Sequence, residues 1–384
     1  MILSSVTLNQ LRNLKETSLS LSPRFNIFSG KNGSGKTSLL EGVYLLTSGR
    51  SFRSTDAEEF ISYSSTSCIL SGLLQPKNPH EHLVRMGVMR DKMGGRVMRV
   101  NEKTCATRAE LVKVIPVQII NTESYQLLHL PPKVRRDFLD WKVFHVEHSF
   151  HSVWVRYARA LKQRNAALKR VKIEGEGAVR AWDAELCEPG AIIANQRKAI
   201  LEIFLPFFLE YLKEFLPTFL NIKEIRVEHK QGWGEDYSLE EALGRAFSRD
   251  LHLGYTTVGP HRADLKFYLN DVPIEAMFSR GQLKLFVCAL MLARSAWLLS
   301  HTGRHSVFLL DDVHSELDTD ASRRLLAGLK RLGGQVWITA IEADLLKECL
   351  AGEEVKMFHV EHGCIREMVE VGAGAPEESS EVVS

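Results

Sequence analysis

The sequence lacks the cysteine pairs that a disulfide framework or a zinc site would need. Its 384 residues include six cysteines, which are scattered without a CxxC pair, and such spacing is typical of reduced thiols in a cytosolic protein. The sequence also lacks a basic leader ahead of an apolar run, and no stretch reaches the ~20 uncharged apolar residues of a membrane span. We therefore expect a soluble, cytoplasmic protein that contacts no membrane.

An excess of charge of either sign is also missing. Lysine and arginine total 49 against 47 acidic residues, for a formal net charge of +2, so overall charge does not mark a nucleic-acid-binding protein and local charge has to decide. Apolar residues make up 45% of the chain, which is ordinary for a protein with a substantial core. Only residues 371–384, which are polar and without periodicity, are expected to form a disordered tail.

The hydrophobic pattern divides the chain into three parts before this tail. In residues 1–130, segments such as CILSGLL, LVRMGVM and RVMRV predict antiparallel strands, and VIPVQII predicts another strand. In residues 131–250 apolar side chains recur every three or four positions, which predicts helices with a break or kink at Pro206. Strand patterns return in residues 251–370, at DLKFYLNDVPI, VFLL and QVWITA. We therefore expect one composite α/β domain with a mainly helical lobe inserted between its halves.

Residues 30–37 read GKNGSGKT and match the GxxxxGK[ST] phosphate-binding pattern between a strand and a helix. Glycines let such a loop wrap around a phosphate at the positive end of the helix. Lys36 would reach the β- and γ-phosphate oxygens, and Thr37 would offer its hydroxyl to Mg²⁺. The predicted phosphate site is formed by Gly30, Lys31, Asn32, Gly33, Ser34, Gly35, Lys36, Thr37 and Ser38.

A phosphate loop of this kind needs a second carboxylate to hold the metal and a group that orients water. The segment VFLLDD places Asp311 and Asp312 where a buried strand would end, and ligands of open α/β sheets bind at that edge. We interpret Asp311 as a Mg²⁺ ligand through water and Asp312 as the catalytic residue that polarises water. Two solvated acids at the start of a turn are the alternative, which the upstream phosphate loop disfavours.

A third motif, Ser279-Arg280-Gly281-Gln282, starts a long apolar helix. Together the three motifs resemble the ATPase heads of the ABC and SMC superfamily, in which the signature Ser and Gly bind the γ-phosphate of ATP held by another head. The resemblance implies a mixed sheet with helices, ATP as the ligand, and a homodimer that forms on ATP. Ser279 would offer a hydroxyl, Gly281 would let the backbone approach, and the N–H groups of the helix start would face an anion.

Further segments are similar to those of the RecF family of bacterial recombination mediators. They occur in the family's order across most of the chain and are LRNL, SGRSFRS, LPPKVRRDFLDW, ALKQRNAALK, VGPHRADL, FSRGQLKLFVCAL and LLDDVHSELD. Arg280 in place of a glycine and Asp312 in place of the usual glutamate follow this family and not a generic ABC head.

The resemblance implies roles for residues outside the three motifs. Gln118 is placed like the glutamine that links Mg²⁺ and the γ-phosphate to the helical lobe, and residues 315–318 resemble the loop that crosses the dimer interface. Arg12 and Asn13 are placed to contact the adenine. No counterpart of the superfamily's switch histidine follows QVWITA, where Thr339 lies near its place. Together with the short Asp312, this predicts a weak ATPase with a turnover below roughly 10 s⁻¹, and the resemblance implies that DNA stimulates it.

Basic residues outnumber acids between residues 133 and 172, in a helical context. Such a bias could mark only a solvated helix face, but two helical lobes of a dimer would flank a cleft that binds phosphates without reading sequence. The DNA-binding candidates are Arg135, Arg136, Arg156, Arg159, Lys162 and Arg164. We expect ATP-dependent binding to duplex or gapped DNA, and the resemblance implies work with RecR and RecO to load RecA at gaps.

Other members of the superfamily fit the sequence less well. An SMC-type tether needs a long heptad coiled coil, and the helical part is interrupted by Pro189, Gly190 and Pro206. The chain after Thr339 has no room for the metal-binding domain of a nuclease, and the segment SRGQLK argues against a transporter subunit. A DNA scaffold that does not hydrolyse ATP stays open, because a sequence gives no rate.

The pentapeptide FHVEH occurs at residues 144–148 and again at 358–362. His145 and His148 could be drawn as a metal pair. Two histidines without a neighbouring cluster of acids or cysteines are more often ordinary core or surface residues.

Overall fold

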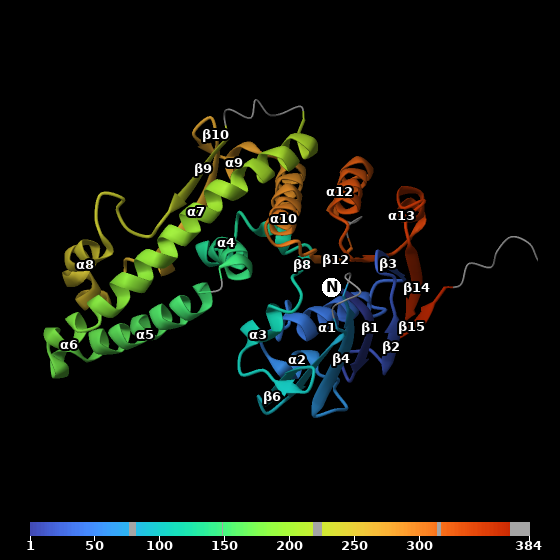
Figure 1. The fold of residues 1–384 in the computed structure, drawn as a ribbon, viewed down its shortest axis with the longest axis horizontal. Helices are drawn as coiled ribbons and strands as arrows, with labels where there is room; N and C mark the ends of the chain where they lie inside the picture. The colour runs from blue at the N-terminus through green and yellow to red at the C-terminus, as the bar shows by residue number, and fades with distance from the viewer. Residues whose placement is uncertain (77–81, 148, 218–224, 313–315, 369–384) are drawn as a thin grey trace, which may run out of the picture.

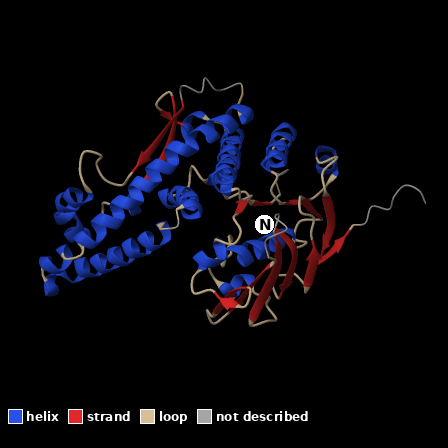
Figure 2. Cartoon of the chain, in the orientation of Figure 1, coloured by secondary structure: helices blue, strands red, loops and turns tan. Residues whose placement is uncertain are grey.

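The computed structural model describes residues 1–76, 82–147, 149–217, 225–312 and 316–368. The two ends of the chain form an α/β head, and the middle forms an elongated lobe (Figure 1). Strands gather in the head and helices in the lobe (Figure 2), so the predicted fold class is confirmed. The predicted tail, His148 and Ser315 lie outside the described residues.

The head contains a six-stranded sheet in the order β15-β14-β3-β13-β12-β8. Its strands are β3 (Phe25–Ser29), β8 (Val117–Ile120), β12 (Val307–Leu310), β13 (Val336–Ala340), β14 (Val355–Glu361) and β15 (Cys364–Glu367). All neighbours pair in parallel except β14 and β15. Because parallel strands end at one edge, the segments that follow β3, β8, β12 and β13 come together there.

A second sheet in the head has the order β2-β1-β4-β5-β6-β7 and is antiparallel. Its strands are β1 (Ile2–Asn9), β2 (Thr17–Ser20), β4 (Ser67–Gln75), β5 (Val84–Asp91), β6 (Arg96–Val100) and β7 (Lys103–Thr104). The three segments predicted as antiparallel strands are β4, β5 and β6, so that prediction is confirmed.

Helix α1 (Lys36–Ser48) lies between the two sheets of the head. Eleven of its 13 residues are buried, and its apolar side chains share one core with both sheets. On the other face of the parallel sheet, α10 (Arg280–Thr302) and α12 (Thr319–Leu332) pack against alternate strand residues such as Ile27 and Ile338. The helix that begins at the phosphate loop is therefore held in place by both sheets of the head.

The helical lobe is built on two long antiparallel helices, α5 and α7 (Figure 1). Its helices are α4 (Pro132–Val146), α5 (Phe150–Glu174), α6 (Glu176–Arg180), α7 (Asp183–Phe215) and α8 (Leu239–Leu253). Helix α7 passes through Pro206 without ending, so of the break or kink predicted at Pro206 the break is wrong. A proline inside a helix costs about 3 kcal/mol, and burial of the neighbouring Phe204 and Phe208 offsets that cost.

A three-stranded sheet, in the order β11-β10-β9, packs on the lobe (Figure 1). Its strands are β9 (Ile225–Lys230), β10 (Asp264–Leu269) and β11 (Val272–Pro273). Residue 250, predicted as the end of the lobe, lies inside α8, and β9 pairs with β10 across that position. The hairpin turn has Asn270 and Asp271 at φ of 49° and 61°, which these two residue types tolerate best among those with a side chain.

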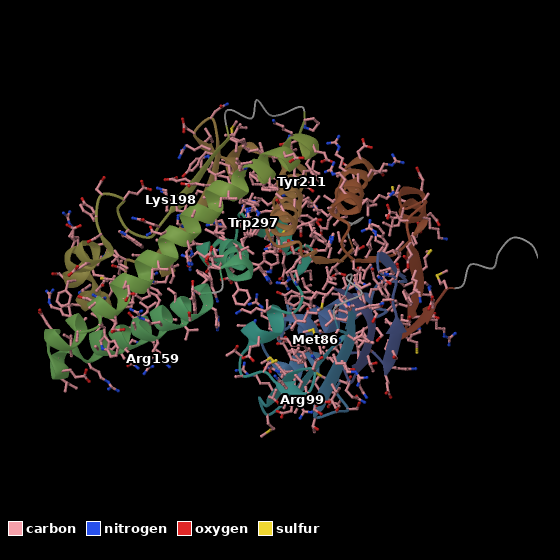
Figure 3. The ribbon with its side chains drawn as sticks, in the orientation of Figure 1. Met86, Arg99, Arg159, Lys198, Tyr211 and Trp297 are labelled. Atoms are coloured by element: carbon pink, nitrogen blue, oxygen red, sulfur yellow. The ribbon has the colours of Figure 1, made fainter. Side chains whose placement is uncertain are left out.

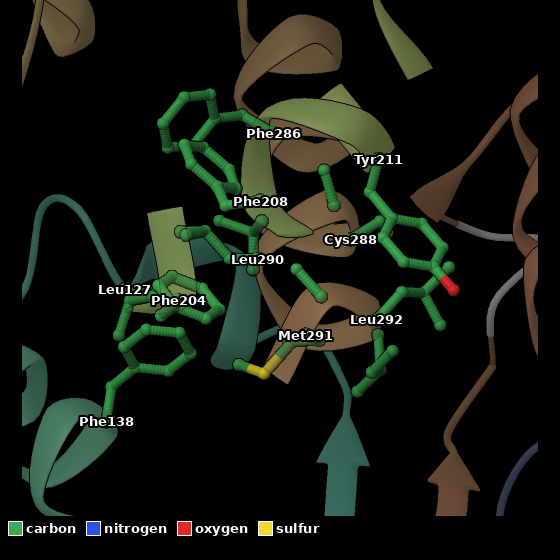
Figure 4. Close-up of a cluster of buried hydrophobic side chains, with 14 of the residues drawn as sticks. Leu127, Phe138, Phe204, Phe208, Tyr211, Phe286, Cys288, Leu290, Met291 and Leu292 are labelled. Atoms are coloured by element: carbon green, nitrogen blue, oxygen red, sulfur yellow. The ribbon is translucent and has the colours of Figure 1, made fainter. Parts of the chain in front are cut away.

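Helix α10 joins the lobe to the head through a shared core. Phe286 of α10 packs edge-on against Phe208 of α7 with ring centroids 5.0 Å apart, and Leu290 and Met291 lie beside Phe204 (Figure 4). In the described part of the chain, α10 is the one helix long and apolar enough to cross a membrane, and 72% of its apolar window is buried inside the protein. A core helix meets the same criteria of length and composition.

Shorter elements connect these parts. They are α2 (Ala57–Phe60), α3 (Arg108–Val112), α9 (Ile274–Met277), α13 (Asp344–Cys349), η1 (Ser124–Gln126) and η3 (Pro260–Arg262).

Candidate nucleotide-binding site

The predicted phosphate loop connects β3 to α1 in a conformation that requires glycine. Gly33 and Gly35 have φ of 78° and 118°, which only glycine adopts without strain, and a Cβ at Gly35 would meet Leu14 Cδ2 at 3.0 Å. Gly35 is also the N-cap of α1, where no side chain satisfies the first N–H groups of the helix. Those groups are available to an anion.

Lys36 lies over this loop. Its Nζ donates hydrogen bonds to the carbonyl oxygens of Gly30 at 2.5 Å and Lys31 at 2.9 Å. Burial lowers the pKa of Lys36, and the charges of Asp312 and Asp311 act in the opposite direction. The ammonium group is thus held by carbonyl oxygens that phosphate oxygens can replace.

The predicted metal ligands meet at the carboxyl edge of the sheet. Asp311 Oδ1 accepts hydrogen bonds from Thr37 Oγ1 at 3.0 Å and from Thr339 Oγ1 at 2.8 Å. Burial raises the pKa of Asp311, although both hydroxyl donors lower it. Hydroxyl and carboxylate oxygens are ligands that Mg²⁺ prefers, so Thr37 and Asp311 fit this ion. Asp312 follows at φ 50°, with its N–H bonded to Thr339 Oγ1 at 2.9 Å.

A cavity of about 420 Å³ opens above these groups. It falls in the size range of ligand pockets, ~300–1,000 Å³. The predicted residues that line it are Arg12, Asn13, Asn32, Gly33, Gly35, Lys36, Thr37, Ser38, Asp311 and Asp312. Asn13, which follows β1, contacts both the phosphate loop and α1, since its Nδ2 donates to Gly33 O at 3.2 Å and its Oδ1 accepts from Ser38 Oγ at 3.0 Å. The structure therefore brings most of the predicted set into one cavity.

Glu41, which the sequence analysis did not single out, organises one wall of the cavity. Its fully buried carboxylate pairs with Arg12 Nε at 2.6 Å, accepts from Ser51 Oγ at 2.5 Å and lies 3.7 Å from Arg53 Nη1. A buried charge needs such partners. Arg53 itself also lines the cavity. A lone glutamate in the apolar run of α1 and the two arginines of SGRSFRS were the available signals.

Gln118 does not lie at this cavity, and the roles assigned to it require correction. In the register of β8 and β12 it pairs with Phe308, whereas Asp311 N donates to the oxygen of Ile120 at 2.9 Å. Gln118 is 1% exposed, and its Oε1 accepts from Arg294 Nε at 2.7 Å. Gln118 lies near the start of β8, whereas the predicted metal ligands lie at the carboxyl edge of the sheet. The residue that follows β8 at that edge is Asn121.

The signature residues lie at the exposed start of α10 and do not line the cavity. Ser279 is the N-cap: its Oγ accepts from Gln282 N at 3.3 Å, and Gln282 Oε1 accepts from Ser279 N at 2.8 Å. One turn further, Lys284 forms an ion pair with Glu316 at 2.6 Å. Glu316 in turn accepts from Thr122 Oγ1 at 2.9 Å, so the signature helix is linked to the segments that follow β8 and β12.

Two of the six DNA-binding candidates are structural, which corrects that prediction. Arg135 pairs with Asp264 through Nε at 2.8 Å and Nη2 at 3.1 Å and is 8% exposed. Arg164 is fully buried and bridges Asp183 and Asp250, each at 2.7 Å. Because both guanidinium groups are buried and paired with carboxylates of the lobe, neither can reach a phosphate, and both residues hold the lobe together.

Replacing Arg164 with methionine is expected to destabilise the protein by about 3–5 kcal/mol, because it leaves Asp250 buried without its cation. Urea unfolding measures this loss. Arg159→Met is the matched control, since Arg159 lies exposed on the same helix (Figure 3), and it should change the free energy of unfolding by less than ~0.5 kcal/mol. Equal stability of the two variants would contradict the structural role of Arg164.

The other four candidates keep polar atoms at the surface. Arg159 and Lys162 are exposed on α5, and Arg156 is exposed but paired with Glu188. Arg136 is half-buried, and its Nη1 donates to the oxygen of Ala263 at 2.8 Å. These four are the ones that can meet a phosphate.

The described parts of the two FHVEH copies lie in different elements. Phe144, His145 and Val146 are the last residues of α4, and residues 358–361 belong to β14. His145 is buried, and burial lowers its pKa to about 3, so it stays neutral. The described residues contain no group of three or more histidines, cysteines and acids that could hold a metal.

Comparison with known proteins identifies the family of the chain. Residues 2–366 match the family described as the RecF/RecN/SMC N terminal domain. The chain is 40% identical to the DNA replication and repair protein RecF of Psychromonas ingrahamii over 366 residues, which cover 95% of this chain and 99% of that protein. It is 38% identical to the RecF protein of Pseudomonas aeruginosa strain LESB58 over 376 residues, 98% of this chain and all of that protein.

Solved structures show the same fold. The recombination mediator protein RecF-ATP in the RecFOR pathway matches with a TM-score of 0.84 and 26% identity, over 96% of this chain and 98% of that one. An Smc head domain from Pyrococcus furiosus matches with a TM-score of 0.57 and 15% identity, over 96% of each chain, which concerns the fold alone.

Fold and site together define an ATPase head of the SMC type, with a phosphate loop, a paired acid edge and a signature helix. Within that class the chain belongs to the RecF family of DNA replication and repair proteins.

Proposed function

We propose that this chain is an ATP-dependent, DNA-binding recombination mediator in gap repair. It dimerises on ATP, binds duplex or gapped DNA, and assists RecA loading together with RecR and RecO in the cytoplasm. Slow, DNA-stimulated ATP hydrolysis then releases it. The relatives' names and the RecFOR pathway of the structural neighbour support this proposal.

The separation of the signature from the nucleotide cavity carries the proposal. Ser279, Arg280 and Gly281 are exposed, and none lines the cavity of their own chain. A Cβ at Gly281 would have Ser279 Oγ as its nearest contact, at 4.0 Å, so the backbone there is open to a large ligand. A second copy of the chain is the partner that could bring these groups to the γ-phosphate, in a two-fold arrangement with two shared ATP molecules.

In the proposed reaction the chain positions ATP and a water molecule. Lys36 and the N–H groups of the loop bind the β- and γ-phosphates, and Thr37 and Asp311 hold Mg²⁺, which neutralises phosphate charge when bound. Asp312 orients and polarises the attacking water. Arg53, on the wall beside Asp311, is placed to contact the nucleotide within the same chain. Arg12, which pairs with Glu41, and Asn13 would contact the adenine.

DNA affinity measured with and without a slowly hydrolysed ATP analogue tests the proposal. Affinity for a gapped duplex should appear only with the analogue and should fall by about 100-fold between 50 and 300 mM salt, as for three phosphate contacts. Arg159→Ala and Lys162→Ala should each lower the salt slope by about one. Arg99→Ala is the control, because Arg99 is exposed on the head, away from the lobe (Figure 3). Affinity that does not change with salt would contradict the phosphate-contact account.

A further inference from the structure

A small pocket of about 190 Å³ lies on the lobe between α4, α5, α7 and η3. We name it the Trp154 pocket. Its walls include Lys133 and Arg136 of α4, Trp154 and Tyr157 of α5, Arg197 of α7 and His261 of η3. It shares no lining residue with the nucleotide cavity, so ATP binding does not account for it.

The floor of the Trp154 pocket is fixed by hydrogen bonds. Arg197 is 2% exposed, pairs with both carboxylate oxygens of Asp140 at 2.7 and 2.8 Å, and donates to the oxygen of Pro260 at 2.7 Å. Tyr157 Oη lies 2.6 Å from His261 Nδ1, and burial lowers the pKa of His261 to about 4. His261 Nε2 lies 3.1 Å from the carbonyl oxygen of Thr256, to which only an N–H can donate. In the neutral ring Nδ1 therefore accepts a hydrogen bond from the Tyr157 hydroxyl, and the floor is preformed.

The rim of the pocket carries an unusual tryptophan. Trp154 is 43% exposed, and the other five tryptophans, all within the described residues, are half-buried or buried. Ala158 and Leu161 line the pocket on the same face of α5, four and seven residues further on. Exposed Lys133 and half-buried Arg136 line the same pocket from α4. An exposed aromatic ring in a pocket that also carries cations is a surface that stacks bases and attracts a nucleic-acid backbone.

Size and charge decide which part of DNA fits. The volume lies below the ~300–1,000 Å³ of pockets that take drug-sized ligands, so the pocket holds one ring system and excludes a base pair. Asp137 and Asp140 also line it; Asp140 is already paired with Arg197, and the carboxylate of Asp137 would repel a bare phosphate. A nucleobase, which has donors, acceptors and a π face, suits this mixture better.

We propose that the Trp154 pocket takes one unpaired nucleobase at a junction of single-stranded and duplex DNA, stacked on Trp154. Lys133 and Lys162 then contact the flanking phosphates. The inference rests on the proposed DNA binding and adds to it a cause for preferring gaps over blunt duplex: only a junction offers an unpaired base next to the duplex.

A fluorescence experiment with the full chain and a slowly hydrolysed ATP analogue tests this. The probe is a duplex with a single-stranded extension whose first unpaired base is 2-aminopurine, and a blunt duplex of equal length is the reference. Binding should quench the 2-aminopurine. Trp154→Ala should remove the quench and lower junction affinity about tenfold, with blunt-duplex affinity unchanged within twofold, and Trp154→Phe should restore most of both. Ile173→Ala, at an 88% exposed position of the same helix, should change neither.

Two results would overturn the inference while leaving the proposed function intact. One is DNA binding by the wild type with no change in 2-aminopurine fluorescence. The other is an equal loss of junction and blunt-duplex affinity in Trp154→Ala, which would make Trp154 a support of the lobe. No binding of either DNA by the wild type would instead remove the proposed function, and the base pocket with it.

Discussion

Replacing Lys36 with alanine is expected to weaken ATP binding by about 100-fold, because charge-assisted hydrogen bonds to the β- and γ-phosphates, worth about 1.5–3 kcal/mol each, are lost. The same change should not lower the free energy of unfolding. Burial lowers the pKa of Lys36, which means that the folded chain disfavours the charged ammonium group. Titration calorimetry with ATP gives the affinity, and urea unfolding gives the stability.

The control for this variant is Lys213→Ala, at an exposed position of α7, which should bind ATP like the wild type. Wild-type affinity in Lys36→Ala would contradict the phosphate role of Lys36. A large loss of stability together with lost binding would instead make Lys36 a structural residue of the loop, held there by the carbonyl oxygens of Gly30 and Lys31.

Replacing Asp312 with asparagine is expected to slow ATP hydrolysis by at least ~100-fold, the usual contribution of a residue that handles the proton of an attacking water. Nucleotide affinity should stay within a few-fold, because Asp312 has φ 50° and asparagine tolerates that conformation as well as aspartate does. Phosphate release under single-turnover conditions measures the rate. ATP-bound dimers of the variant should consequently persist longer than those of the wild type.

Asp320→Asn, on the exposed surface of α12, is the matched control and should hydrolyse ATP at the wild-type rate. Unchanged hydrolysis in Asp312→Asn would remove Asp312 from the catalytic role. No measurable hydrolysis by the wild type would favour the alternative of a DNA scaffold that does not use ATP turnover. A wild-type turnover above roughly 10 s⁻¹ would contradict the expectation of slow hydrolysis.

The sequence was sufficient to predict the phosphate site because its parts are local or share one edge of a sheet. The loop and Lys36 follow one strand directly, and Asp311 follows another. Parallel strands bring such residues together whatever separates them in sequence, which explains why Thr37 and Asp311 lie 3.0 Å apart across 274 positions. The signature at residues 279–282 was recognised only through the resemblance to a family. The structure shows that Ser279, Arg280 and Gly281 are exposed.

The sequence could not show which charged residues are buried. From the sequence alone, a charged residue in a helix is expected at the surface. This expectation applied to Arg135, Arg164 and Glu41. Burial becomes visible only when partners from distant segments are known, such as Asp264 for Arg135 at 2.8 Å and Arg12 for Glu41 at 2.6 Å. The same holds for α7, since its continuation through Pro206 depends on packing that no local pattern reports.

Gln118 shows a limit of another kind. A prediction by resemblance can be in error by a few positions along the chain. An error of that size is enough to move a side chain from the edge of a sheet into its interior. With a rise of about 3.3 Å per residue, the step of three residues from Gln118 to Asn121 separates a buried side chain bonded to Arg294 from the carboxyl edge of the sheet, where the predicted metal ligands lie. Registers between β8 and β12 were needed to decide it.

The shared ATP site is the central claim, and sedimentation of the purified chain without nucleotide, with ADP and with a slowly hydrolysed ATP analogue tests it most directly. Ser279→Arg should be compared with Ser238→Arg, because Ser238 caps α8 with the same reciprocal hydrogen bonds, to Glu241, that Ser279 makes with Gln282. We predict a dimer only with the analogue, lost in Ser279→Arg and kept in Ser238→Arg. A monomer in every condition, or a dimer that Ser279→Arg leaves intact, would contradict the claim.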